Sequence, residues 1–339
     1  MKIIMVSMMH DYGIKERDFS YDYYNMYDTL KKMTGVNVIF FDYMETLNEA
    51  GRGEMNIRLL ALIEKEKPDL TTFSLYTDQL LPETLDKARS FTKTLCYFWD
   101  DQWRIQFALQ WAPHFDYLTT PDYDGIRKWK SRGFNKVIYS PFGSNPNKWK
   151  RLDVPKKYDV SFVGMKHSYR EWILRKLEKA GISVHTVGAG WPSGFVSYDE
   201  IINIFNQSRI NLNLSNSISY DLRYAFSSLR AVRDVANSLR ASGDVKNREQ
   251  IKGRHFEIPG CGGFQLSFYV EGLEHCYDIG QEIAVYSDTD DLIEKINYYL
   301  KYEDDRERIA AAGYQRTLRD HTYEKRVKDI LAYTGLMNG

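Results

Sequence analysis

Short apolar runs alternate with amphipathic stretches throughout the first half of the chain. These runs predict β-strands at residues 2–7, 36–41, 70–75, 94–99, 117–119 and 137–140. Between them, apolar residues at helical spacing predict helices at residues 57–63 and 82–91, and in a stretch through Tyr24, Tyr27, Leu30 and Met33. Short strands separated by helices pair in parallel through right-handed crossovers, so we expect a doubly wound α/β sheet.

A polar segment with two prolines, residues 146–157, interrupts this alternation and is interpreted as a linker. The pattern then restarts, with strands predicted at residues 159–163, 183–187, 210–214, 264–268 and 282–286 and helices at residues 169–180, 198–206, 219–248, 290–301, 304–318 and 322–333. The 339 residues are therefore predicted to form two Rossmann-like domains, residues 1–150 and 157–320, whose sheets face each other across a cleft. Residues 321–339 are a C-terminal helix that is a candidate to pack back on the N-terminal domain.

The composition narrows the classes of function. Acidic and basic residues balance at 46 each, which argues against a polybasic surface for nucleic acid or anionic lipid. The three cysteines, Cys96, Cys261 and Cys276, give neither a disulfide framework nor a metal-binding pair and fit a reducing compartment. The first apolar run is too short for a signal peptide, and no stretch approaches the roughly 20 apolar residues of a membrane span. We therefore expect a cytoplasmic protein.

Polar and glycine-rich segments lie at the ends of several predicted strands. They are His10–Gly13 and Asp100–Trp103 in the first half, and Gly164–Lys166, Gly188–Trp191 and Lys252–Phe264 in the second. Ligands of open parallel sheets bind beyond the carboxyl ends of the strands, so these segments are the candidate site. His10–Gly13 stands where a Rossmann dehydrogenase has its GxGxxG turn, which argues against that class.

Three motifs in the second half form an ordered set. They are Asp-Val-Ser-Phe-Val-Gly at residues 159–164, Ile-Asn-Leu-Asn-Leu-Ser at 210–215, and Gly-Arg-His-Phe-Glu-Ile-Pro-Gly-Cys-Gly-Gly-Phe at 253–264. With these motifs the chain resembles the GT-B glycosyltransferases, in particular the spore-maturation protein CgeB group, from about Tyr158 to its C-terminus. In the first half, residues 99–101 and 141–145 also fit this group. The resemblance implies a GT-B architecture and transfer of a sugar from a UDP- or GDP-linked donor to an acceptor.

The resemblance also assigns residues to the donor. Glu257 matches the glutamate that holds the ribose of the nucleotide through two charge-assisted hydrogen bonds. Related retaining enzymes carry a second glutamate eight positions earlier, where Glu249 stands, but the residues between lack the usual glycine-rich pattern. The full set of candidates for nucleotide-sugar binding is Gly164, Lys166, Arg170, Gly188, Val196, Glu249, Lys252, Arg254, Glu257, Gly262 and Gly263.

The residue types in this stretch support the same interpretation. Gly262 and Gly263 permit close backbone approach and positive φ, and N–H groups at a helix start attract a diphosphate. Lys252 and Arg254 supply the positive charge that other glycosyltransferases take from a metal ion. We therefore expect no metal site, and no cofactor apart from the nucleotide-sugar substrate.

The donor assignments have structural alternatives. Arg254 and Glu257 could form a buried ion pair at a helix start. Gly164 and Lys166 could close a strand–helix turn, and Arg170 could be a solvated helix residue.

His10, Asp100 and Asp101 are the catalytic candidates, because they follow predicted strands of the N-terminal domain, which is the acceptor side. The alternatives are an ordinary loop histidine and aspartates that cap the following helix. Asp288-Thr289-Asp290 spells the DxD of metal-dependent glycosyltransferases, but it precedes a helical apolar pattern and is interpreted as an N-cap.

Two further groups of residues are interpreted as structural. Trp99, Trp103 and Trp111 are expected in the core or a cleft wall, with sugar stacking as the alternative. The predicted helix 219–248 carries Arg223, Arg230, Arg233, Arg240 and Arg248. These arginines are interpreted as a solvated face, and the alternative is the docking of a polyanionic acceptor or partner.

Two other functions stay open at this point. One is a nucleotide-sugar epimerase, which uses water in place of an acceptor. The other is a non-catalytic carbohydrate-binding or assembly protein that keeps the fold. The sequence leaves open the donor sugar, the base, the acceptor (glycan, protein, lipid-linked or small molecule), the stereochemistry and the oligomeric state.

Overall fold

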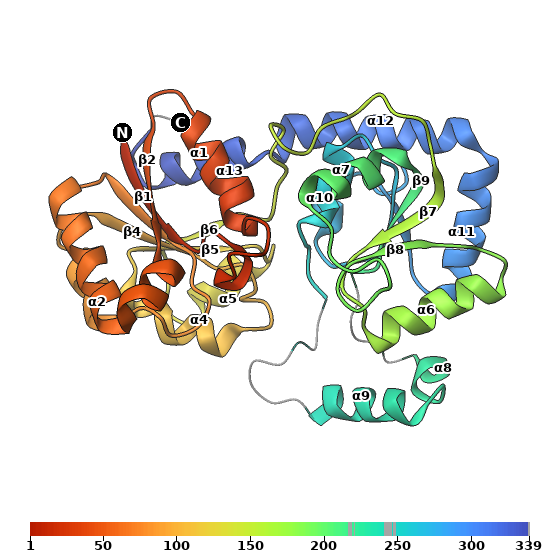
Figure 1. Ribbon diagram of the computed structural model, residues 1–339, viewed down its shortest axis with the longest axis horizontal. Coiled ribbons are helices and arrows are strands. Elements are labelled where there is room, and N and C mark those ends of the chain that lie inside the picture. Colours follow the sequence, from red (N-terminus) through yellow and green to blue (C-terminus); the bar gives the residue numbers. More distant parts are fainter. Residues whose placement is uncertain (216–218, 220, 241–245, 247–248, 338–339) are drawn as a thin grey trace. The chain divides into compact units, whose positions relative to one another are not determined.

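The computed structural model describes residues 1–215, 219, 221–240, 246 and 249–337. The chain forms two compact units (Figure 1). Unit 1 consists of Met1–Pro141 and Tyr323–Gly339, and unit 2 of Phe142–Thr322. Each unit contains one parallel β-sheet with helices packed on it, as the alternation of strand and helix patterns predicts.

The sheet of unit 1 has six strands in the order β2-β1-β3-β4-β5-β6. Their bounds are β1 Lys2–Ser7, β2 Asn37–Asp42, β3 Leu70–Phe73, β4 Lys93–Tyr97, β5 Tyr117–Thr120 and β6 Val137–Tyr139. In β1, Ile3 to Ser7 are all buried, since both faces of a parallel sheet are covered. The strand order reverses between β1 and β3, which creates a topological switch point at their carboxyl ends.

The C-terminal helix is part of unit 1. The helices and short helical turns of this unit are η1 Asp11–Gly13, η2 Tyr23–Tyr27, α1 Asp28–Lys32, α2 Tyr43–Glu66, α3 Pro82–Ala88, α4 Ile105–Trp111, η3 Ala112–His114, α5 Gly125–Lys130 and α13 Tyr323–Tyr333. On α13, Tyr323, Val327 and Ile330 form one buried stripe in a core cluster that also holds Ile3 of β1. Lys93 Nζ donates to the carbonyl oxygen of Thr334 at 2.7 Å, which ties the end of the chain to β4.

The sheet of unit 2 has five strands in the order β11-β10-β9-β7-β8. Their bounds are β7 Tyr158–Val163, β8 His185–Val187, β9 Ser208–Asn213, β10 Gln265–Phe268 and β11 Ala284–Tyr286. The helices are α6 Ser168–Lys179, α7 Tyr198–Gln207, α8 Leu222–Ala225, α9 Leu229–Arg240, α10 Arg254–Gly260, η4 Leu273–His275, α11 Thr289–Lys301 and α12 Glu303–Asp320. The core cluster of this unit joins α6, α11 and α12 to the sheet.

The predicted linker, residues 146–157, is instead a packed part of unit 2. Trp149 is 1% exposed and its ring lies 6.2 Å from that of Phe205. The backbone N–H of Leu152 donates to the side-chain oxygen of Asn206 at 2.8 Å. The division between the units therefore falls at Pro141, earlier than the boundary expected at residue 150.

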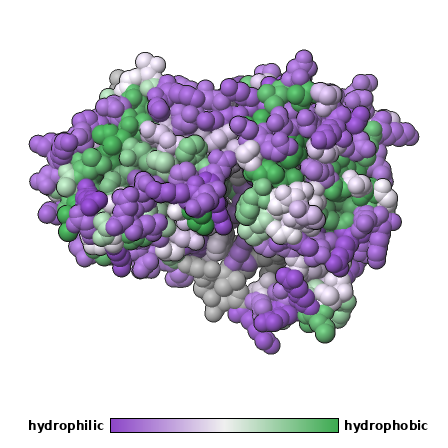
Figure 2. Space-filling view, in the orientation of Figure 1, coloured by the Kyte–Doolittle hydropathy of each residue, from purple (hydrophilic) through white to green (hydrophobic). Residues whose placement is uncertain are grey.

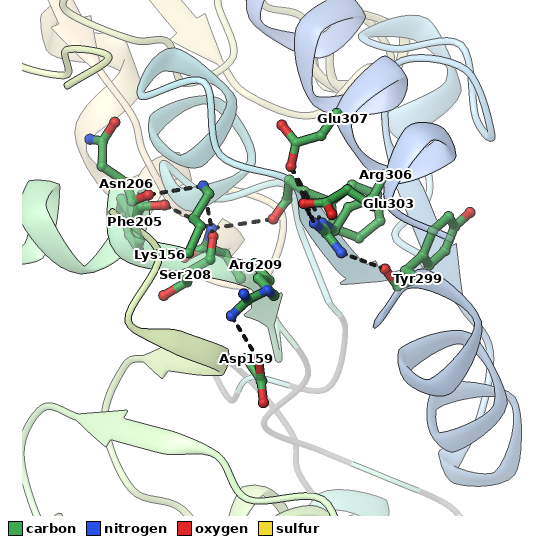
Figure 3. A network of polar contacts seen from close by, with 12 residues as sticks. Lys156, Asp159, Phe205, Asn206, Ser208, Arg209, Tyr299, Glu303, Arg306 and Glu307 are labelled. Atoms are coloured by element: carbon green, nitrogen blue, oxygen red, sulfur yellow. Dashed lines mark hydrogen bonds and ion pairs between the residues drawn. The ribbon is translucent and has the colours of Figure 1, made fainter. Parts of the chain in front are cut away.

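Figure 3 shows how the end of this segment is held. Lys156 Nζ donates to the carbonyl oxygens of Asn206 and Ser208, at 2.9 and 3.1 Å. Nearby, the buried Arg306 of α12 donates to the carbonyl oxygen of Tyr299 at 2.8 Å. These contacts lie at the amino ends of β7 and β9, the edge of the sheet opposite the expected ligand edge, so we interpret them as structural.

Residues 219–248 do not form one helix over their described part. The helix α8 ends at Ala225 and α9 begins at Leu229. Between them the chain turns: Ser227 N donates to the carbonyl oxygen of Tyr224, and Ser228 Oγ accepts from Ala231 N. Arg248 lies outside the described residues.

Candidate functional site

The helix α10 carries the most motif-rich segment of the sequence. It begins at Arg254, and its residues from His255 to Gly260 are all buried. Phe256 packs against the rings of Tyr277 and His321, at 5.8 and 5.3 Å. The apolar side of the helix thus fixes the place of its polar residues.

Glu257 of α10 is fully buried and forms an ion pair with Arg254. The spacing i, i+3 places both side chains on one face of the helix. Arg254 in turn lies over the ring of Phe205, 5.6 Å from its centre. Burial raises the pKa of the Glu257 carboxyl, and the neighbouring Arg254 opposes that rise. Among the described residues, the second carboxylate oxygen, Oε1, has no hydrogen-bond partner.

The structure brings five of the eleven predicted donor residues into one charged cluster. Burial lowers the pKa of Arg170, Glu249 raises it, and Arg254 lowers it further, so these three charges act on one another. Burial likewise lowers the pKa of Lys246, which lies 3.5 Å from Glu249 and also responds to Lys252. The cluster contains Arg170, Lys246, Lys252 and Arg254 against Glu249 and Glu257. Its excess of positive charge suits a diphosphate.

His255 was not among the residues predicted to bind the donor. It is fully buried, with Nδ1 3.0 Å from Lys252 N and Nε2 3.2 Å from Ser267 Oγ. Burial lowers its pKa to about 4, so the ring is neutral at pH 7. His255 therefore fixes the backbone turn that presents Lys252 and Arg254. Its place directly after Arg254 in the sequence gives no sign of this role.

Gly164, Lys166 and Gly188 lie together at the carboxyl ends of β7 and β8. The backbone N–H of Gly164 donates to Val187 O, and that of Lys166 donates to Ala189 O, both at 2.8 Å. The Lys166 ammonium lies 3.3 Å from Glu171. This supports the turn-closing alternative for Gly164 and Lys166. Of the other donor candidates, Arg170 donates to two backbone carbonyls, and Val196 is half-buried in the segment before α7.

Gly188 is the glycine of this edge whose substitution we expect to be costly. Its φ is +129°, and a Cβ would lie 2.5 Å from the carbonyl oxygen of Gly164. Gly188→Ala is therefore expected to destabilise unit 2 by about 2 kcal/mol, from backbone strain and displacement of the neighbouring loop. Urea unfolding of both proteins measures this. Gly181→Ala, with φ +80° but nothing within 4 Å of its Cβ, is the control for φ strain alone.

Gly262 and Gly263 lie beyond α10, so their N–H groups are not those of a helix start. They follow the carboxyl end of α10, where their N–H groups donate to the carbonyls of Pro259 and Ile258, at 2.8 and 3.0 Å. Gly262 has φ +70°, which ends the helix, and a Cβ on Gly263 would lie 2.8 Å from Asn211. The two glycines therefore serve helix termination and packing, and their amides are already used.

The catalytic candidates of unit 1 lie at two different places. Asp100 and Asp101 line a pocket of about 230 Å³ at the carboxyl ends of β1, β3 and β4. His10 lines a separate hollow beside Asp42, and its Nδ1 lies 3.1 Å from Arg17 O. The structure therefore does not join His10 to the two aspartates.

Asp100 and Asp101 also differ from each other. Asp100 is partly exposed and accepts from the indole N–H of Trp103 at 3.2 Å, so its carboxylate does not cap α4. Asp101 is 5% exposed and accepts from the Trp129 indole at 2.7 Å. Burial raises the pKa of Asp101 to about 7.

A further buried carboxylate, Asp22, lines the same pocket and was not predicted. Ser7 Oγ donates to it at 2.8 Å, and burial raises its pKa. Its sequence context, between tyrosines, carries no motif.

Of the tryptophans considered in the sequence, Trp99 lines the pocket, whereas Trp111 belongs to the core. The pocket thus combines carboxylates with aromatic side chains, a combination that suits a sugar.

The segment Asp288-Thr289-Asp290 is an N-cap, as predicted. Asp288 Oδ1 accepts from the N–H groups of Asp290 and Asp291, at 2.8 and 3.0 Å, at the start of α11. Asp290 forms an ion pair with Arg223. In the part of the chain that the structure describes, no group of three or more His, Cys, Asp or Glu side chains is placed to hold a metal ion.

Comparison with known proteins defines the class. The family described as "Glycosyl transferase-like" matches residues 170–332, which include α10 and all six residues of the charged cluster. Over the whole chain the fold is similar to sucrose-phosphate synthase from Thermosynechococcus elongatus, with a TM-score of 0.64, 11% identity and 99% and 98% of the two chains covered. It is also similar to Anabaena HepE in complex with UDP-glucose, with a TM-score of 0.66, 10% identity and 99% and 100% covered.

The structural similarities confirm the predicted α/β GT-B fold, and the family match over residues 170–332 supports the glycosyltransferase class. More narrowly, the chain is CgeB-like: it is 20% identical to the spore protein CgeB of Bacillus subtilis over 249 residues, which cover 68% of this chain and 72% of CgeB. A search of the described helices found none with the length and apolarity needed to cross a bilayer.

Proposed function

We propose that this protein transfers a sugar from a UDP-linked donor to an acceptor hydroxyl, with the nucleotide bound by the charged cluster of unit 2. The observation that carries the proposal is the Oε1 atom of the fully buried Glu257, which has no hydrogen-bond partner within the described part of the chain. A buried carboxylate oxygen without a donor is costly, and a ribose hydroxyl supplies that donor. Arg254 holds the other carboxylate oxygen, so the acceptor atom is already oriented.

The positive charges beside Glu257 complete the nucleotide site. Arg170, Lys252 and Arg254 offset the charge that develops on a diphosphate leaving group. The choice of UDP over GDP is supported by the similarity to Anabaena HepE, whose structures contain UDP and UDP-glucose. The three buried free thiols agree with a cytoplasmic site of action.

The first test is nucleotide binding without a metal. Because lysine and arginine side chains take the place of a cation, UDP affinity measured by calorimetry is expected to agree within about twofold in magnesium and in excess chelator. UDP-glucose turnover is measured under the same two conditions. Loss of binding or turnover on chelation would show that the reaction needs a metal ion. Equal binding of UDP and GDP would remove the base preference from the proposal.

Catalytic assistance is proposed to come from unit 1. Asp100 is the stronger candidate, because it lines the pocket with Asp22 and Asp101, whereas His10 lies at another hollow. We expect Asp100→Asn to lower turnover and to leave UDP affinity unchanged within about twofold. His10→Ala is the parallel variant. If both proteins kept full turnover with the true acceptor, unit 1 would contribute positioning only.

The stereochemical outcome is read from the same reaction. NMR of the anomeric proton in the product distinguishes inversion, which requires a base near the acceptor hydroxyl, from retention. Retention would favour a role for Glu249, which stands eight positions before Glu257 and belongs to the charged cluster.

A further inference from the structure

The short helices α8 and α9 expose an unusual amount of apolar surface. The exposed apolar set consists of Leu222 at 69%, Phe226 at 81%, Leu229 at 91%, Val232 at 47% and Leu239 at 70%. Single exposed apolar residues are ordinary, but a contiguous group on neighbouring helical turns marks an interaction surface. The exposed apolar set is such a group within 19 residues of chain, Leu222–Arg240.

The opposite side of these helices is anchored to α6. Ala231 is 1% exposed, and Tyr224 is 2% exposed with its ring 4.9 Å from that of Tyr169. The Tyr224 hydroxyl donates to Asp234 at 3.1 Å, and Ser168 at the start of α6 donates to the same carboxylate. The helix α9 therefore has a second apolar face, which is buried against α6. The burial of that face fixes which side chains point outward.

On α9 the outward apolar residues share one face and arginines border it. At 100° per residue, Leu229, Val232 and Leu239 fall within one third of the helix circumference. The three arginines of the helix, Arg230, Arg233 and Arg240, all lie on its exposed part. No ion pair joins these arginines to another described residue, unlike Arg223, which binds Asp221 and Asp290. In Figure 2 the surface around this element shows hydrophilic and hydrophobic side chains next to one another.

We propose that the exposed face of α8 and α9 docks on the surface of an anionic lipid bilayer. An amphipathic helix of this kind lies in the plane of the interface, with its apolar residues at the acyl boundary and its arginines at the phosphates. The positive charge of this face favours an anionic bilayer over a second copy of the chain, because contact between two copies would bring the same three arginines together. The acidic residue of α9, Asp234, is on the anchored side and does not offset the arginines. This inference does not depend on the proposed function.

The test is co-sedimentation of the full chain with vesicles. Binding is expected to equimolar phosphatidylcholine and phosphatidylglycerol, and to be weak with phosphatidylcholine alone. Each arginine near an anionic surface contributes a factor of roughly five, so the triple variant Arg230→Gln, Arg233→Gln, Arg240→Gln should bind about a hundredfold more weakly. In a Leu229→Trp variant, the tryptophan emission should shift to shorter wavelength when anionic vesicles are added, because the side chain enters an apolar medium.

Matched variants elsewhere serve as controls. The triple variant Arg127→Gln, Arg175→Gln, Arg319→Gln removes the same charge from exposed sites, and Ile57→Ser removes an apolar side chain that is 64% exposed on α2. Both should bind vesicles like the unmodified protein, and far-UV circular dichroism checks that every variant is folded.

Three results would overturn the proposal. The first is no sedimentation with either vesicle. The second is an equal loss of binding in the control triple variant. The third is self-association without vesicles that Leu229→Ser abolishes, because the face would then join two copies of this chain.

Discussion

Glu257→Gln is expected to bind UDP about a hundredfold more weakly than the unmodified protein, as measured by calorimetry. Glutamine keeps the volume of the side chain but removes its charge. The hydrogen bond from a ribose hydroxyl to Oε1 then loses its charge assistance. In addition, Arg254 loses the carboxylate that orients it. Together these losses amount to roughly 2–3 kcal/mol.

The same substitution also lowers the stability of unit 2, and this effect must be separated from binding. Removing the buried carboxylate takes an ion-pair partner from Arg254, whose side chain is 27% exposed, and costs about 1–3 kcal/mol. Titrations are therefore run well below the unfolding temperature of the variant, after circular dichroism shows it to be folded.

Ser208→Ala is a matched control for reduced stability. Ser208 Oγ is buried at the amino end of β9, within hydrogen-bond distance of Ser161 Oγ at 2.7 Å and of Ile204 O at 2.6 Å. Its loss should destabilise unit 2 by about 1–2 kcal/mol and leave UDP affinity unchanged. If Glu257→Gln bound UDP as tightly as Ser208→Ala does, Glu257 would be a structural ion-pair residue of α10, and the nucleotide site would lie elsewhere.

The strands of both sheets could be predicted because their apolar runs reflect burial on two faces. Leu70–Phe73 and Ile210–Asn213 are examples in which nearly every residue is buried. The lengths of the helices were harder to predict from the sequence. The helix α2 runs from Tyr43 to Glu66, far beyond the predicted residues 57–63, because its first turns carry polar residues and include Gly51 at φ +81°. Packing in the core determines where such a helix begins and ends, and local periodicity does not.

Residues of the candidate site could be predicted from the sequence only where they belong to a recognisable motif. Glu257 and Arg254 could be placed by the resemblance, and the structure pairs them. Asp22 and His255 could not be predicted, because their pKa values are shifted by burial among residues that are distant in the sequence. The positive φ expected of Gly262 is observed, but the sequence did not show that its amide would be used to end α10.

The stability of unit 2 is expected to fall in acid through His255. The pKa of this residue is about 4 in the folded chain, against 6.5 for an unperturbed histidine. Between these values the unfolded chain binds a proton that the folded chain does not, so stability rises with pH. The contribution is complete above about pH 6.5 and is lost as the pH falls toward 4, to a total of roughly 3 kcal/mol.

The physical cause is the burial of the ring between two hydrogen-bonding groups. The neutral ring accepts the N–H of Lys252 at Nδ1, and its Nε2–H donates to Ser267 Oγ, which itself donates to Phe268 O. Protonation at Nδ1 converts an acceptor into a donor facing that N–H and places a charge in a site without solvent. The nearby charge of Lys252 adds to the cost, while the carbonyl of Lys252, 3.1 Å from Nδ1, offsets part of it.

A His255→Asn variant isolates this titration from those of the other histidines. The asparagine side-chain oxygen can accept from Lys252 N, and it carries no proton in this pH range. Urea unfolding at about pH 7.5 and pH 5 should show a loss of about 2 kcal/mol in the unmodified protein beyond that in the variant. UDP affinity is not expected to follow this titration, because with a pKa of about 4 the ring in the folded chain is still neutral at pH 5. Parallel pH dependence in the two proteins would mean that His255 remains neutral, or is equally protonated, in both the folded and the unfolded chain.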